Sequence, residues 1–279
     1  MTSFEGHIDV EGGRLWMQAD GEGTGVVLVH AGIADARMWD PQWDAFVAAH
    51  RVVRYDTRGF GRTEGGDVAF SNRADLLAAI DAAGIERATL VGCSRAGSIV
   101  LDTALESPER VAGLVWVCGG VSGLEMEDTP EELAMYERGE ALEEAKDWAG
   151  AADLEVELWV DGVGQPKGRA PEAVRELVRT MTYETYIQEK PGGQPIPLDP
   201  PAAGRLGEIR VPTLIIIGEL DTLSTRLSAE VLASSIQDAH RITVPAVTHL
   251  PNLERPEWFT RTVLDFLARV DDPEIVAAS

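Results

Sequence analysis

A serine stands between a strand-like and a helix-like segment in LVGCSRAGSIV, residues 90–100. A serine hydroxyl is a weak nucleophile until a base lies beside it and its angle of attack is fixed. A sharp turn from strand to helix fixes that angle and leaves backbone N–H groups at the helix start facing developing negative charge. Small residues are needed two positions before and after the serine, and Gly92 and Ala96 are both small, although Ala96 replaces the usual glycine. Ser94 is therefore a candidate nucleophile.

Short apolar segments that could position this serine alternate with helical patterns along the chain. An amino-terminal hairpin is predicted because FEGHIDV and RLWMQAD flank Glu11, Gly12 and Gly13. The later runs are apolar enough for strands of a parallel sheet covered on both faces. They are VVLVH, HRVVRYD, ATLVGCS, GLVWVCG, TLIIIGE and HRITVPA, beginning at residues 26, 50, 88, 113, 213 and 240. This alternation predicts an α/β fold with a mostly parallel central sheet and helices on both faces.

Two helices are predicted with particular clarity. ADLLAAIDAAG, residues 74–84, places Leu77 and Ile80 near one face and ends at Gly84, which suits a helix C-terminus. RPEWFTRTVLDFLARV has Pro256 at its start and then repeats apolar residues at helical spacing.

A long segment without a comparable strand signal separates the fourth and fifth apolar runs. A capping-box pattern at residues 129–132 opens an acidic helix, and the charged run over residues 125–147 is expected to be a solvated face. Residues 191–204, rich in proline and glycine, form the expected return linker. We therefore expect a helical insertion, residues 121–205, over one edge of the sheet. The core would comprise residues 1–120 and 206–279.

Five segments resemble those of the α/β-hydrolase fold family, in the family's order. His30-Ala31-Gly32 is similar to the family's His-Gly-x loop, with Ala31 in place of its glycine, and DTRGFG, residues 56–61, is similar to its Asp-x-Arg-Gly-x-Gly turn. SPERVAGLVWV resembles the segment leading into the next strand, GELD the acid loop and THLPNLERPEWF the histidine loop. The resemblance covers nearly the whole chain outside the insertion, which it identifies as a helical cap.

The resemblance implies a catalytic triad. In this fold the triad follows the chain order serine, acid, histidine, which Ser94, Asp221 and His249 obey. His249 would take the Ser94 proton and later deliver it to the leaving group, while Asp221 orients the imidazole and stabilises its protonated form. Glu219 is a rival acid, but the Gly-x-x-Asp spacing favours Asp221.

The resemblance also implies an oxyanion hole and a substrate pocket. The backbone N–H groups of Gly32 and Arg95 would hold the oxyanion, with Ile33 in reserve. Ile33, Arg95 and Trp159 are candidate substrate contacts. Aromatic residues of the insertion could line an apolar wall against a small to medium hydrophobic substrate, or most of them could simply belong to the core of the cap. These residues are Trp148, Trp159, Tyr183 and Tyr186.

Arg95 departs from the family, where an apolar residue is commoner after the serine. A cation at a helix N-terminus opposes the helix macrodipole. Its guanidinium could pair with an acidic group of the insertion, or it could bind a carboxylate or another anionic part of the substrate. The sequence leaves both hypotheses open.

The other four histidines are weaker candidates for the base. His7 and His50 lie at predicted strand edges, and His240 begins a strand. His30 ends a strand but precedes the serine in the chain. We expect His30 to support the oxyanion loop by hydrogen bonding.

Composition limits the partners of the protein. The 279 residues include 24 Lys and Arg against 47 Asp and Glu, and the net charge of −23 disfavours nucleic acid and anionic membranes. The first ten residues lack a basic region followed by an apolar run, so we expect no secretory signal, and no apolar stretch reaches membrane-spanning length. Cys93 and Cys118 form no zinc or disulfide pattern. We expect a cytoplasmic protein that binds a small-molecule substrate without a metal or organic cofactor. The sequence leaves open whether the protein forms a homodimer.

These observations predict a serine hydrolase acting on a carboxylic ester or lactone through an acyl-enzyme. The same triad would serve hydrolysis of carbon–carbon bonds or perhydrolysis. The same scaffold would also serve a cofactor-free lyase or a ligand receptor with little turnover. A covalent acyl adduct separates the hydrolase from the lyase, and turnover separates an enzyme from a receptor.

Overall fold

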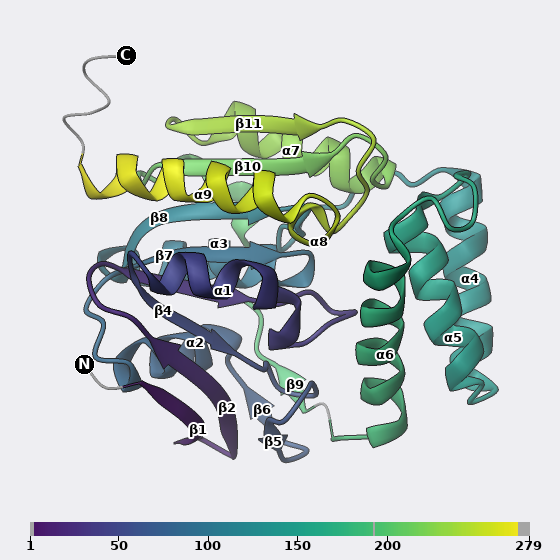
Figure 1. Cartoon of the computed structure of the whole chain (residues 1–279), viewed down its shortest axis with the longest axis horizontal. Helices are drawn as coiled ribbons and strands as arrows, with labels where there is room; N and C mark the ends of the chain where they lie inside the picture. Colours follow the sequence, from purple (N-terminus) through teal and green to yellow (C-terminus); the bar gives the residue numbers. More distant parts are fainter. Residues whose placement is uncertain (1–2, 192, 273–279) are drawn as a thin grey trace.

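The computed structural model describes residues 3–191 and 193–272 and has one large β-sheet at its centre (Figure 1). Nine strands form this sheet within the described chain. They are β1 (Phe4–Val10), β2 (Gly13–Asp20), β3 (Gly25–Val29), β4 (Arg51–Tyr55), β5 (Glu64–Gly65), β7 (Ala88–Cys93), β8 (Val111–Val117), β10 (Thr213–Gly218) and β11 (Ala239–Val244). Their order is β1-β2-β4-β3-β7-β8-β10-β11, with β5 paired to β2. From β4 to β11 all neighbours are parallel, whereas β1, β2 and β5 pair antiparallel.

The predicted α/β class with a mostly parallel sheet is confirmed. All six apolar runs are strands, and the predicted hairpin is β1 and β2, with Gly12 at φ 70° in its turn. Every residue of β3, β7 and β10 is buried, as expected for strands covered on both faces. β11 differs because it is an edge strand with one neighbour, and His240 and Arg241 on it are exposed.

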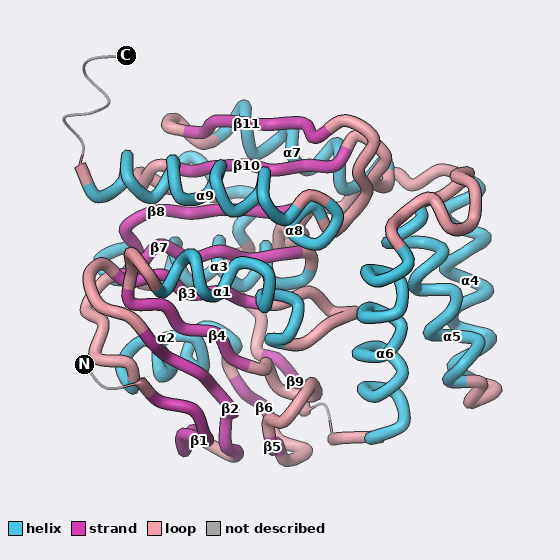
Figure 2. Tube along the Cα trace, viewed as in Figure 1, coloured by secondary structure: helices cyan, strands magenta, loops and turns pink. Residues whose placement is uncertain are grey.

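Helices cover both faces of the sheet. They are α1 (Asp40–Val47), α2 (Asn72–Ala82), α3 (Arg95–Glu106), α7 (Leu223–Ser235), α8 (Pro251–Glu254) and α9 (Pro256–Asp271). α1 and α9 lie together on one face, and α2, α3 and α7 lie on the other (Figures 1 and 2). The two clearest predictions correspond to α2 and α9. Ser71 caps α2 by accepting a hydrogen bond from Ala74 N at 3.2 Å, and Gly84 follows that helix with φ 69°.

The segment between β8 and β10 is mainly helical, as predicted, and stands beside the sheet (Figure 1). It contains α4 (Pro130–Glu144), α5 (Trp148–Glu155), a π-helical segment (Val156–Gly162) and α6 (Glu172–Gln188). The capping box of α4 is confirmed by the hydrogen bonds between Thr129 and Glu132. Most acidic residues of α4 are solvated, as expected. Glu132 is the exception, because only 4% of it is exposed.

The return to the core is more than a linker. β9 (Gln194–Pro195) pairs in parallel with β6 (Ala69–Phe70) in a small second sheet. Across residues 3–191 and 193–272, no helix has the length and apolar character needed to cross a bilayer.

Candidate active site

Ser94 occupies a strained turn between β7 and α3. Its φ of 58° and ψ of −125° are a backbone conformation that residues other than glycine rarely adopt. Glycine is required at position 92, because a Cβ there would lie 2.5 Å from the Ala96 carbonyl oxygen. Position 97 has the same requirement, since a Cβ would lie 2.7 Å from Gly119 Cα. Ala96 itself is fully buried, so the turn accommodates alanine at this position.

The Ser94 side chain does not cap the helix that follows it, since it accepts no hydrogen bond from the first turn of α3. The backbone of Ser94 is instead fixed by neighbouring chain segments. Its N–H donates to Val117 O at 2.9 Å, and its carbonyl accepts from Gly97 N at 2.8 Å and from Gly120 N at 3.0 Å. The hydroxyl is therefore held at the turn but left free for another partner.

That partner is His249. Ser94 Oγ lies 2.8 Å from His249 Nε2, and His249 Nδ1 lies 2.9 Å from both carboxylate oxygens of Asp221. An ionised carboxylate only accepts hydrogen bonds, so Nδ1 carries the proton and Nε2 accepts from the hydroxyl. Asp221 also accepts from Thr222 N at 2.8 Å. The structure thus brings together the three residues predicted for a triad, from the carboxyl ends of β7, β10 and β11.

The rival acid is engaged elsewhere. Glu219 accepts a hydrogen bond from Ala246 N at 2.9 Å and is exposed, whereas Asp221 is buried. Of the two carboxylates, only that of Asp221 contacts His249.

The predicted oxyanion loop lies beside the turn. A Cβ placed on Gly32 would lie 3.9 Å from Arg95 Cβ, which brings the two predicted oxyanion residues together. His30 supports this loop as expected: its Nδ1 lies 2.8 Å from Ala31 O and its Nε2 accepts from Thr57 N at 2.9 Å. Burial lowers the pKa of His30, so its ring is neutral and can both donate and accept.

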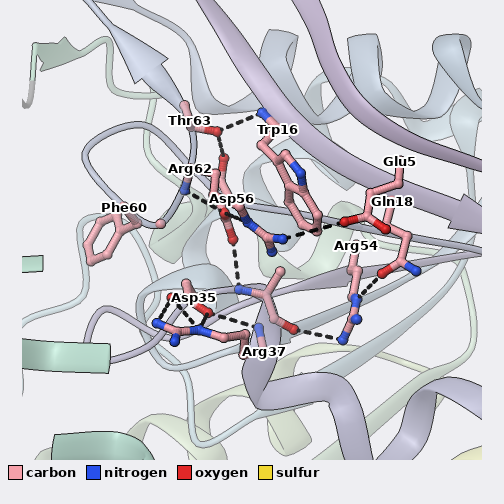
Figure 3. Close-up of polar contacts among 12 residues, drawn as sticks. Glu5, Trp16, Gln18, Asp35, Arg37, Arg54, Asp56, Phe60, Arg62 and Thr63 are labelled. Atoms are coloured by element: carbon pink, nitrogen blue, oxygen red, sulfur yellow. Dashed lines mark hydrogen bonds and ion pairs between the residues drawn. The ribbon is translucent and has the colours of Figure 1, made fainter. Parts of the chain in front are cut away.

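Asp56 anchors the continuation of this loop (Figure 3). Its two carboxylate oxygens accept from Ala36 N at 2.9 Å and from Arg62 N at 2.7 Å. Gly61 is required in the same turn, because its φ is 50° and a Cβ would lie 2.2 Å from an Asp56 carboxylate oxygen. Arg54 donates to Ala36 O at 3.2 Å, so the loop after Gly32 is held from both sides.

The insertion contacts the candidate base directly. The centroid of the Trp159 ring lies 4.4 Å from that of the His249 ring. The ring of Tyr136 stacks on Trp159, with 6.2 Å between the ring centroids. The backbone is tied as well, because His249 N donates to Trp159 O at 3.3 Å and Thr248 Oγ1 donates to Val160 O at 2.8 Å. The π-helical segment thus packs against the histidine loop.

A cavity of about 290 Å³ opens onto Ser94 and His249. Of the predicted substrate contacts, Arg95 and Trp159 line it. Its remaining lining residues are Ser98, Cys118, Gly119, Gly120, Val121, Leu124, Met126, Ser224, Thr225 and Ser228. Sequence reasoning missed the hydroxyl groups, although Ser98 follows Ser94 by one helical turn and Ser224 and Ser228 repeat at the same spacing after the acid loop.

Other expected pocket residues lie elsewhere. Ile33 is outside the cavity lining, and its carbonyl accepts from Thr182 Oγ1 of α6 at 2.9 Å. Trp148 stacks on Tyr186 at 5.6 Å within the insertion, and Tyr183 is 37% exposed. The expected aromatic wall is therefore reduced to Trp159, because the other three aromatic rings pack between helices or face outward.

Arg95 forms no ion pair with an acid of the insertion within the described residues, so that hypothesis is not supported. Its Nη2 donates to Thr57 Oγ1, and its guanidinium lies 4.8 Å from the Phe60 ring. Burial lowers the pKa of Arg95, with the phenol of Tyr55 opposing this effect.

One group of side chains has the types and spacing of metal ligands. Potential ligand atoms of Cys118, Asp221 and His249 lie within 4.8 Å of one another. Both nitrogens of His249 are already hydrogen-bonded, and burial raises the pKa of the Cys118 thiol well above its usual value. A metal needs a thiolate and a free imidazole nitrogen, so these residues do not fit one.

A parallel sheet that carries a serine, an acid and a histidine at the carboxyl ends of three strands defines the α/β hydrolase class. Residues 26–262 match the alpha/beta hydrolase family, and the chain belongs to this family. The similar proteins named below are hydrolases, which supports a hydrolase.

Three similar proteins illustrate the family. The chain is 28% identical to 2-hydroxy-6-oxo-6-phenylhexa-2,4-dienoate hydrolase of Burkholderia cepacia, over 91% of each chain. It is 26% identical to 3-oxoadipate enol-lactonase 1 of Acinetobacter baylyi, covering 93% of this chain and 95% of the other. Among solved structures, Est816, described as an N-acyl homoserine lactone degrading enzyme, has a TM-score of 0.73 at 26% identity and covers 93% and 99% of the two chains.

Proposed function

We propose that the protein is a serine hydrolase that cleaves a small to medium carboxylic ester or lactone through an acyl-enzyme on Ser94. The observation that carries this proposal is the continuous chain of hydrogen bonds from Ser94 Oγ through His249 to Asp221, at 2.8 and 2.9 Å. The cavity beside Ser94 and His249 supports it, because a small molecule can reach the hydroxyl.

In the proposed reaction, Ser94 Oγ attacks the carbonyl carbon while His249 Nε2 accepts its proton. The Asp221 carboxylate stabilises the imidazolium through Nδ1. The backbone N–H groups of Arg95 and Gly32 bind the oxyanion of the tetrahedral intermediate. His249 then protonates the departing alcohol oxygen. Water attacks the resulting acyl-enzyme with His249 as base, and release of the carboxylic acid restores the serine.

Ester or lactone cleavage is favoured because two of the similar proteins bear the names of lactone-cleaving enzymes. The strained turn at Ser94 also supports covalent catalysis, since it presents the hydroxyl to His249 rather than to the start of α3.

Within this proposal, residues 121–205 form a cap over a core of residues 1–120 and 206–279. The contact between Trp159 and His249 supports it, because the insertion thereby covers the base. The substrate would be a small molecule held between cap and core. The cytoplasmic location and the homodimer stay predictions.

The test is the intact mass of the protein after exposure to a fluorophosphonate, followed by turnover on a panel of esters and lactones. We expect one covalent adduct on the wild type and none on Ser94→Ala or His249→Ala. Ser98→Ala is a matched control, because this cavity serine lies outside the triad and should leave the adduct intact. A folded wild type that forms no adduct would contradict the proposal and favour a lyase or receptor.

A further inference from the structure

Arg95 is a lining residue of the active-site cavity, and its side chain has no acidic partner in the part of the chain that the structure describes. The chain carries 47 acidic against 24 basic residues, so an arginine is easily paired. Neighbouring arginines are paired: Arg37, Arg58 and Arg62 lie 2.6, 2.7 and 3.3 Å from aspartate oxygens. Within residues 3–191 and 193–272, Arg95 has no ion pair, although it contacts Thr57 and Phe60 of the loop that carries Arg58 and Arg62.

The guanidinium of Arg95 is nevertheless held in place. The Phe60 ring lies 4.8 Å from it, and Nη2 donates to Thr57 Oγ1. Its stem packs beside Gly32, where a Cβ would lie 3.9 Å from Arg95 Cδ. Nε is enclosed and has no hydrogen-bond partner in the described chain. The cation is thus fixed by the hydroxyl of Thr57 and the ring of Phe60, two residues outside the cavity lining, and Nε is a donor that no described residue uses.

An enclosed charge without a counterion is costly, and a carboxylate is the group whose shape matches the planar donor edge of arginine. His30 supplies no competing charge, because burial lowers its pKa and keeps it neutral. Other walls of the cavity carry the hydroxyls of Ser98, Ser224 and Thr225, the last two in the first turn of α7. These hydroxyl groups suit an oxygen-rich part of a ligand, while the apolar lining residues Val121, Leu124, Met126 and Trp159 suit the hydrophobic part expected from sequence.

We infer that the substrate carries a carboxylate in addition to its ester or lactone group, and that the Arg95 guanidinium binds this carboxylate. The inference rests on the proposed hydrolase function and specifies its substrate class. Arg95 follows Ser94 directly in the chain, so the carboxylate would bind close to the carbonyl that Ser94 attacks. A small molecule is therefore long enough to carry both groups.

The experiment compares two esters that differ only in charge. Monomethyl glutarate carries a carboxylate, and methyl 4-carbamoylbutanoate carries an amide of the same shape. We expect wild-type kcat/KM to favour the acidic ester. In Arg95→Met the ratio should fall roughly 10- to 100-fold, the value of a hydrogen-bonded charge, through loss on the acidic ester. Arg226→Met, which removes an exposed charge from α7 outside the cavity lining, should leave the ratio unchanged.

An unchanged ratio in Arg95→Met, or equal losses on both esters, would overturn the inference and leave the hydrolase proposal standing. Failure of the wild type to form a fluorophosphonate adduct would instead overturn the proposed function. A second test uses only the wild type, so it does not depend on whether a variant folds. It measures how far glutarate and glutaramide slow labelling of the wild type by the fluorophosphonate. Glutarate should slow fluorophosphonate labelling at roughly tenfold lower concentration than glutaramide, and equal inhibition would contradict carboxylate binding by Arg95.

Discussion

Glu132 Oε1 accepts a hydrogen bond from Leu223 N at 2.9 Å, which joins α4 to the first residue of α7. Leu223 stands two residues after Asp221. The other Glu132 oxygen accepts from Thr129 N at 2.7 Å. One buried carboxylate therefore ties the insertion to the loop that carries the acid of the candidate triad.

Replacing Glu132 should destabilise the protein. Glu132→Ala leaves two backbone N–H groups without their acceptors, so we expect the free energy of unfolding to fall by about 1–3 kcal/mol. Glu132→Gln keeps one acceptor oxygen, so its free energy of unfolding should fall by less than that of Glu132→Ala. Urea unfolding measures both variants. Glu131→Ala, at an exposed neighbouring position, is the control, and equal stability of Glu131→Ala and Glu132→Ala would refute this role.

Replacing Asp56 should loosen the loop that follows Gly32. Asp56→Ala removes the acceptors of Ala36 N and Arg62 N, and we expect a loss of at least about 2 kcal/mol of unfolding free energy. Fluorophosphonate labelling should also slow, because the loop holds a predicted oxyanion donor. Asp81→Ala removes an exposed ion pair and should cost under about 1 kcal/mol. Equal effects of the two variants would argue against the anchoring role.

Stability should depend on pH through His30. Burial lowers the pKa of His30 from its ordinary value of 6.5, so below that pH the unfolded chain binds a proton that the folded protein excludes. The contribution is therefore fully present above about pH 6.5 and is lost as the pH falls below it, by at most about 1.4 kcal/mol per pH unit.

Urea unfolding of the wild type and His30→Asn between pH 7.5 and 5.5 checks this prediction. The variant should show a shallower pH dependence. Some dependence should persist, because burial also lowers the pKa of His50. Gln237→Ala, at an exposed position whose side chain does not titrate, should keep the wild-type slope. Identical slopes for wild type and His30→Asn would show that His30 does not couple folding to protons in this range.

Local physics was enough to predict much of this protein from its sequence. Doubly covered parallel strands must be apolar throughout, so the six runs identified the sheet. The turn at Ser94 needs small residues two positions before and two positions after the serine, and this spacing can be recognised in the sequence. The candidate triad of Ser94, Asp221 and His249 was instead predicted from the resemblance to the α/β-hydrolase fold family, whose chain order these residues follow. The strands and the turn depend on neighbours close in sequence, which is why local physics predicts them.

The surroundings of the site were decided by tertiary packing. Glu132 belongs to an acidic run that suits a solvated face, and it is buried only because α4 meets the start of α7, 91 residues further along the chain. Trp159 contacts His249 while Trp148 does not, because the π-helical segment turns one ring toward the core. The absence of an ion pair at Arg95 among the described residues depends on which side chains surround it after folding. Sequence thus determined the strands and the candidate triad, whereas long-range packing decided which groups enclose them, since burial and pairing arise only between segments distant in the chain.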